Sequence, residues 1–95
     1  MKLPRSFEMT VTRAEFMRLL PAAVGGDVFA EEPDAFVHRE PNRSWRIGFQ
    51  ALPELRIALV KLVRHRVEFE FEGYAANEID VFMARFELYT RRGGG

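Results

Sequence analysis

The spacing of apolar positions changes along the chain. Apolar and polar residues alternate in a short first stretch, and apolar residues then recur every three or four positions. Alternation returns over roughly forty residues from Asp34, and helical spacing returns before the C-terminal glycines. The pattern predicts the α+β class: a single antiparallel sheet of about five strands with two helices on one face, in the order β-α-β-β-β-β-α.

Five segments have the alternation of strands with one buried face. They are residues 6–11, 35–40, 44–52, 55–59 and 66–72. The last is the clearest, because three apolar residues alternate with three glutamates. Segment 53–63 also fits a helix begun by Pro53, since its leucines recur at helical spacing. Its β-branched residues favour a strand, followed by a bulge or turn before His65.

Two segments have helical spacing. The first begins at Thr12-Arg13-Ala14-Glu15, a capping-box pattern in which each end residue accepts a backbone hydrogen bond from the other. Pro21 is expected to end or kink this helix, and Gly25-Gly26 to stop it. Asn77 is expected to cap the second helix.

The inward positions of these elements define a core rich in phenylalanine, which occurs nine times. Large rings contribute much of the buried area in such cores. The expected members are Phe7, Met9, Trp45, Ile47, Phe49, Leu55, Ile57, Val67, Phe69 and Phe71 from the sheet, and Phe16, Leu20, Phe82 and Phe86 from the helices.

Length and composition indicate one domain. The 95 residues are 47% hydrophobic and 29% charged, which predicts a single α+β domain over residues 1–92 and a flexible glycine tail at 93–95. The absence of cysteine excludes disulfides and thiolate chemistry. No stretch approaches the roughly 18 apolar residues of a membrane span, and the start lacks a signal-like apolar run. We therefore expect a cytoplasmic protein without membrane contact.

The predicted element order resembles the β-α-four-β-α unit of TATA-box-binding protein and, more loosely, helix-grip folds. That resemblance is one of topology and implies no site residues. A second resemblance is to a group of small uncharacterised bacterial proteins and covers most of the chain from Phe36 onward. It implies a family without an activity. It is carried by Trp45-Arg46-Ile47, Arg56-Ile57, Arg66-Val67, Phe82, Arg85-Phe86 and the closing Arg92-Gly93-Gly94-Gly95.

Charge is unevenly distributed, although the net charge is zero. The stretch 38–66 holds seven basic and two acidic residues, and both flanks are acidic. Two arginine pairs flank the turns expected after the second and fourth strands, which a consecutive meander places at one end of the sheet. The candidate binding site is therefore a basic patch for an acidic protein partner, formed by Arg39, Arg43, Arg64 and Arg66. Alternatively, the acidic residues of 31–34 fold over that end and neutralise it.

Catalytic and metal-binding patterns are lacking. His38 and His65 are the only histidines, and without cysteine they complete a three-ligand site only by recruiting scattered carboxylates. We interpret both as surface turn residues. Ser6 and Ser44 lack the context of an activated nucleophile. The sequence predicts no catalytic residues, no metal and no cofactor.

The sequence therefore predicts a small soluble binding or adaptor module that engages a protein partner. One alternative is a small-ligand carrier or enzyme with a pocket between the sheet and the C-terminal helix. Another is ubiquitin-like use of the glycine tail, which extends from a helix here and is more simply a helix C-cap.

Specific nucleic-acid binding is not expected. The outward face of the last strand carries a carboxylate at every other residue, which repels phosphate, and the aromatic residues share the core parity. Titration with single- and double-stranded oligonucleotides at moderate salt should show no saturable binding tighter than the roughly 10⁻⁴–10⁻⁶ M of non-specific contact. A sequence-dependent nanomolar complex would contradict this prediction.

Overall fold

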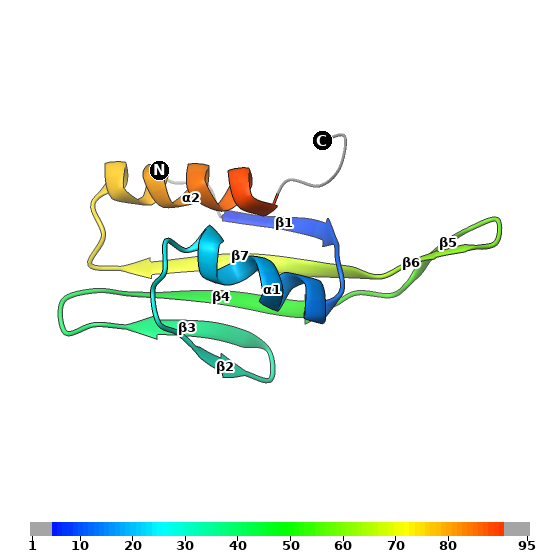
Figure 1. Ribbon diagram of the computed structural model, residues 1–95, viewed down its shortest axis with the longest axis horizontal. Coiled ribbons are helices and arrows are strands. Elements are labelled where there is room, and N and C mark those ends of the chain that lie inside the picture. The colour runs from blue at the N-terminus through cyan, green and yellow to red at the C-terminus, as the bar shows by residue number, and fades with distance from the viewer. Residues whose placement is uncertain (1–4, 91–95) are drawn as a thin grey trace.

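The computed structural model describes residues 5–90. Five antiparallel strands form one sheet in the order β1-β7-β4-β3-β2, and two more strands form a separate hairpin (Figure 1). The strands are β1 (Arg5–Thr10), β2 (Ala30–Glu32), β3 (Ala35–Arg39), β4 (Ser44–Ala51), β5 (Leu55–Ile57), β6 (Val60–Leu62) and β7 (Arg64–Glu72), and the helices are α1 (Arg13–Ala23) and α2 (Ala76–Thr90). The predicted α+β class is confirmed.

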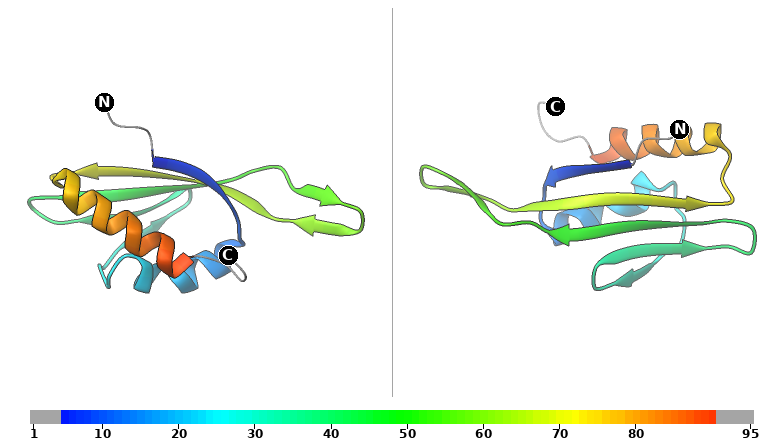
Figure 2. Two further views of the ribbon diagram at one scale, coloured as in Figure 1. Left: turned by 90° about the horizontal axis from the view of Figure 1, so that it is seen from above. Right: turned by 180° about the vertical axis from the view of Figure 1, so that it is seen from behind.

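Both helices lie against the same face of the five-stranded sheet (Figure 2). Alternation along β4 and β7 directs their large apolar side chains to this face, and Ile47 lies opposite Phe69 in the ladder. From the helices, Phe16 stacks on Phe49 with ring centroids 4.4 Å apart, and Phe86 meets Phe69 edge-on at 4.8 Å. The expected aromatic core is therefore present.

Two strand predictions are wrong in detail. Residues 31 and 32, which lie outside the five predicted strands, belong to the short edge strand β2, which pairs with β3. Segment 55–59 does not join the main sheet, and Leu55 and Ile57 are exposed rather than core residues. The fifth strand of the sheet is therefore β2, whose pairing through Ala30–Glu32 depends on β3 and not on its own apolar content.

β5 and β6, with the Ala58–Leu59 turn between them, form an arm that projects beyond the sheet (Figures 1 and 2). The hydrogen bonding between β4 and β7 ends with the bond from the Leu52 N–H to the Arg64 carbonyl, which is 3.0 Å long. Pro53 has no N–H to continue the ladder, so pairing resumes separately at Leu55. With the arm, the molecule measures 48 × 25 × 25 Å.

The helix ends follow the sequence closely, with two differences. The capping box between Thr12 and Glu15 is present, and Gly25 adopts a positive φ of 71° just after α1. Pro21 lies inside α1, because a proline in the last turn removes only one internal hydrogen bond before the helix ends. Asn77 is not the cap of α2: the helix begins at Ala76, and the Ala75 N–H donates to Glu78.

The predicted glycine tail at 93–95 lies outside the described residues. Among residues 5–90, no helix combines the length and the apolar content needed to cross a membrane.

Phe69 offers a direct test of the core. It is 8% exposed and contacts the rings of Phe7 and Phe86. The substitution Phe69→Ala should lower the free energy of unfolding by about 3–5 kcal/mol, because it removes buried area and leaves a cavity. Denaturant unfolding measures the loss, with Leu88→Ala on the exposed side of α2 as the control. Equal, small losses in both variants would contradict the described packing.

Candidate functional site

The four arginines of the expected basic patch lie at two opposite ends of the sheet. Arg39 and Arg43 flank the turn between β3 and β4, next to the end of β7 at Glu72, which pairs with Ser44. Arg66 pairs with Gln50 at the other end of the same ladder. Arg66 and Glu72 are six positions apart along the strand, about 20 Å at 3.3 Å per residue. The structure therefore does not bring the four together.

The arginines separate into two groups because the segment expected to form the fourth strand lies outside the five-stranded sheet. β4 and β7 are neighbours joined through the arm, so the His65 region lies at the arm end and not beside the β3–β4 turn. Nearby carboxylates also pair two of the arginines. Arg64 donates to Glu8 at 3.0 Å, and Arg43 donates to Glu40 at 3.3 Å.

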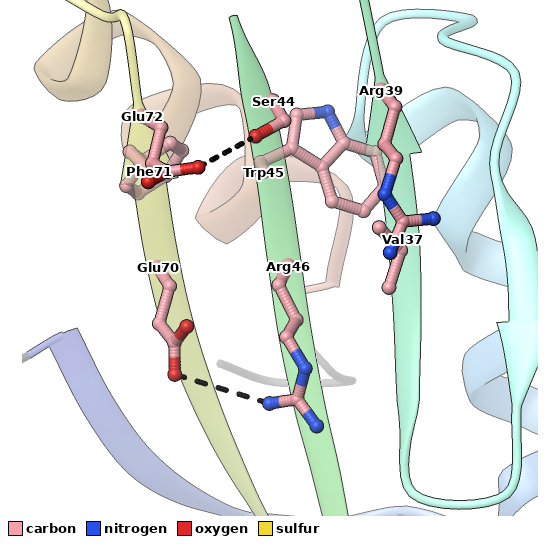
Figure 3. Close-up of a pocket in the computed structure, with 8 residues that line it drawn as sticks. All are labelled: Val37, Arg39, Ser44, Trp45, Arg46, Glu70, Phe71 and Glu72. Atoms are coloured by element: carbon pink, nitrogen blue, oxygen red, sulfur yellow. Dashed lines mark hydrogen bonds and ion pairs between the residues drawn. The ribbon is translucent and has the colours of Figure 1, made fainter.

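The sheet face away from the helices, here called the outer face, carries a ladder of opposite charges. Arg46 lies 3.9 Å from Glu70 across the β4–β7 pair, and the Ser44 hydroxyl donates to Glu72 at 3.4 Å. Together with Arg39 these side chains line a hollow of about 350 Å³. Figure 3 shows how they lie on the strands. Exposed ion pairs of this length contribute little to stability. We therefore interpret the side chains around the hollow as a solvated charge ladder.

Both histidines lie on strands and are buried, so their interpretation as surface turn residues was wrong. His65 of β7 stacks on Phe49 at 4.0 Å and hydrogen-bonds the Val11 carbonyl. His38 of β3 is 8% exposed and stacks on Trp45. Strand alternation turns both rings toward the helix-covered face, where stacking on aromatic rings replaces contact with water.

Three residues, Asp27, His38 and Glu40, form what we call the His38 cluster at the end of β3. The His38 Nδ1 lies 2.6 Å from the Val28 carbonyl oxygen, and Nε2 lies 2.6 Å from Glu40 Oε2. Asp27 Oδ2 is 3.9 Å from Nε2 and accepts a 2.9 Å hydrogen bond from the Trp45 indole N–H. The loop after α1 and the β3–β4 turn therefore meet at one imidazole.

The contacts of His38 favour its charged form. Burial lowers the pKa of His38, but the hydrogen bonds to Glu40 and to the Val28 carbonyl and the charge of Asp27 together raise it above 6.5. The same hydrogen bond lowers the pKa of Glu40 below 4.5. Because both ring nitrogens face acceptors, the doubly protonated ring satisfies both contacts.

A pocket of about 290 Å³ adjoins the His38 cluster, and Asp27 forms part of its wall. Arg43 and Tyr74 line it too, with the Arg43 guanidinium 4.8 Å from the centre of the Tyr74 ring. The Tyr74 hydroxyl oxygen is buried without a hydrogen-bond partner among residues 5–90, and burial raises the pKa of Tyr74. The turn before α2 approaches the β3–β4 turn closely here, which is possible because Gly73 has no Cβ to collide with the Asn42 carbonyl oxygen.

The arm is the other unusual surface. Leu55 pairs with Leu62 and Ile57 with Val60, so one face of the hairpin is apolar. Arg56 pairs with Lys61, so the other face carries two like charges directly opposite each other. At the tip, Leu59 is fully exposed, and Ala58 adopts a φ of 54°, which favours glycine.

Part of both features was visible in the sequence. His38 and Glu40 are two residues apart on a strand and therefore share a side, but nothing in the sequence links them to Asp27. In the arm, Leu59 and Val60 are consecutive apolar residues that break the alternation. That break marked a change in structure without showing that the segment leaves the sheet.

No protein-family model, no curated protein and no solved structure matches the chain. The two resemblances drawn from the sequence therefore stay expectations.

The His38–Glu40 pair predicts a pH-dependent stability. The contribution of His38, whose pKa is raised, is complete below pH 6.5 and is lost as the pH rises through its folded value. The contribution of Glu40, whose pKa is lowered, is complete above pH 4.5 and is lost as the pH falls through its folded value. The stability advantage of the wild type over Glu40→Gln should therefore be greatest between these two values.

Urea unfolding at pH 5.5 and at pH 8.5, with EDTA present, measures this difference. Glu87→Gln, on the exposed side of α2, is the control and should follow the wild type at every pH. An advantage over Glu40→Gln that is the same at both pH values would show that the pair is not charged.

Proposed function

We propose that the protein is a binding module that engages an acidic protein partner through the arm. The observation that carries the proposal is the projecting β5–β6 hairpin with exposed apolar side chains, an arrangement that leaves apolar area in water. A partner that covers the arm removes this area from water, which is the main driving force of protein association.

The apolar face of the arm supports a protein partner. Ile57 is 57% exposed, and Val60 opposite it is also exposed, although both are β-branched residues typical of packed strands. Leu59 at the tip is fully exposed, in a two-residue turn where Asn-Gly or Gly would be less strained. A tip of this kind resembles a side-chain anchor more than a solvated turn, since anchors fill pockets in a partner.

The basic face of the arm supports an acidic partner. Arg56 and Lys61 lie directly opposite each other, and like charges in this position destabilise a hairpin. No carboxylate among residues 5–90 forms an ion pair with either side chain. A partner that covers the apolar face of the arm and carries carboxylates nearby would remove the repulsion between Arg56 and Lys61. The basic site of the proposal is thus Arg56 and Lys61, with Arg66 nearby at the arm end of β7.

The interior favours this module over a small-ligand carrier. The Phe69 ring meets the rings of both Phe82 and Phe86 between the sheet and α2, where a carrier would need its cavity. The pocket of about 290 Å³ lies instead at the end of the sheet, between the first turns of α2 and the residues Asp27 and Arg43. Ubiquitin-like use of the tail concerns residues 93–95, outside the described structure, and stays a prediction.

A photo-crosslinking amino acid placed at residue 59 in the native cell should join the partner covalently, because Leu59 leads the arm. The same amino acid at Val81, an exposed apolar position on α2, is the control and should not capture that partner. Mass spectrometry identifies the product, and light scattering of the purified protein separates a foreign partner from self-association.

The need for positive charge on the arm is tested with the double variant Arg56→Glu/Lys61→Glu. The control is the double variant Arg18→Glu/Arg39→Glu, which changes the net charge equally at exposed sites away from the arm. Only the arm variant should lose the crosslinked partner, and neither should lower the melting temperature markedly. If both variants capture the same partner as the wild type, or if position 81 captures it equally well, the arm is not the binding surface.

A further inference from the structure

We propose that the His38 cluster binds a divalent transition-metal ion, with zinc the best match, through His38 Nε2 and one carboxylate oxygen each from Asp27 and Glu40. These three atoms lie within 4.8 Å of one another. This site is separate from the arm and does not depend on the proposed partner.

The imidazole is oriented as a ligand. His38 Nδ1 lies 2.6 Å from the Val28 carbonyl oxygen and donates to it, which directs Nε2 toward the two carboxylates. Metal-binding histidines are commonly held in this way, with the second ring nitrogen donating to a backbone carbonyl. Stacking on Trp45, with ring centroids 5.6 Å apart, fixes the plane of the ring.

The Asp27 carboxylate is held in place by a group that is not itself a ligand. The Trp45 indole N–H donates to Asp27 Oδ2 at 2.9 Å, and the indole is almost completely buried. An outer hydrogen bond of this kind keeps a carboxylate turned toward the metal. Asp27 therefore comes to the site from a loop, but its orientation is set by the core.

The two distances from His38 Nε2 to the carboxylate oxygens need only small changes. Ligands at 2.0–2.1 Å from a tetrahedral zinc ion are about 3.3 Å apart. Nε2 lies 2.6 Å from Glu40 Oε2 and 3.9 Å from Asp27 Oδ2, so one distance must open and the other close by roughly 0.6–0.7 Å. Glu40 is exposed and lies just after β3, so its side chain can move by this amount.

The surroundings leave room for the remaining ligands. Asp27 also lines the pocket of about 290 Å³, from which water can complete the coordination shell. The metal ion takes the place of the Nε2 proton, and its charge balances the two carboxylates. Arg43 also donates to Glu40 Oε2, and because a carboxylate oxygen has two lone pairs, Oε2 can accept this bond and still coordinate the metal.

The donor set determines the class of ion. One imidazole and two carboxylates match zinc and manganese, whereas calcium takes six to eight oxygen ligands and few nitrogens. Without cysteine the site does not favour soft monovalent copper. We therefore expect zinc to bind more tightly than manganese, and both more tightly than calcium.

Trp45 is the only tryptophan in the chain and touches both His38 and Asp27, so its fluorescence reports on the site. The untagged full-length protein is treated with a chelator, dialysed and titrated with zinc chloride, with fluorescence and calorimetry read in parallel. The proposal expects saturation at one ion per chain and a shift of the His38 Nε2 resonance by NMR.

Glu40→Gln and Asp27→Asn should each weaken zinc binding at least about tenfold. Glu78→Gln is the matched control, because Glu78 also pairs with Arg43 and lines the pocket but does not belong to the cluster. If Asp27→Asn fails to fold, Glu40→Gln at an exposed position still tests the site. The proposal is overturned if the wild type shows no saturable binding up to millimolar zinc, or if Glu40→Gln binds as tightly as the wild type.

Discussion

The pairing of β4 with β7 is the constraint on which the rest of the molecule depends. The two strands are central in the sheet, and their ladder runs from Ser44 opposite Glu72 to Ala51 opposite His65. Because side chains alternate, one face of this ladder supplies the aromatic core and the other supplies the charges of the outer face. This pairing sets the positions of the two helices, the two edge strands and the arm.

The same ladder separates the two surfaces for which we propose functions. At one end, the turn before β4 carries Glu40 and Arg43 toward the loop that holds Asp27. At the other end, Pro53 interrupts the hydrogen bonds and the chain continues as the arm. Eight residues of extended strand span about 26 Å, so an ion at the His38 cluster and a partner on the arm would not touch.

The two surfaces also differ in their physical state. In the His38 cluster, every ring nitrogen and the indole N–H have acceptors, so the polar groups are satisfied without a ligand. The arm keeps apolar side chains in water and places Arg56 against Lys61. An unsatisfied surface of this kind is stabilised by a partner, whereas a satisfied cluster can exchange a proton for a metal ion with little rearrangement.

Local patterns predicted much of the fold. The capping box of α1, the glycine stop after it and the buried parity of β4 and β7 each depend on residues within a few positions of one another. Edge strand β2 was missed because its residues are polar, and its pairing comes from β3. Leu55 and Ile57 were assigned to the core because alternation shows that a segment is a strand without showing what covers it.

The sequence by itself determined the α+β class, the aromatic core and the helix boundaries to within a few residues, because hydrophobic periodicity and capping are local properties. Tertiary structure alone decided that the basic residues separate into two ends, that His38 is buried and that Asp27 reaches it. Those outcomes depend on strand order and on the point where the ladder stops. Contacts between residues distant along the chain set both, and no spacing within one segment encodes them.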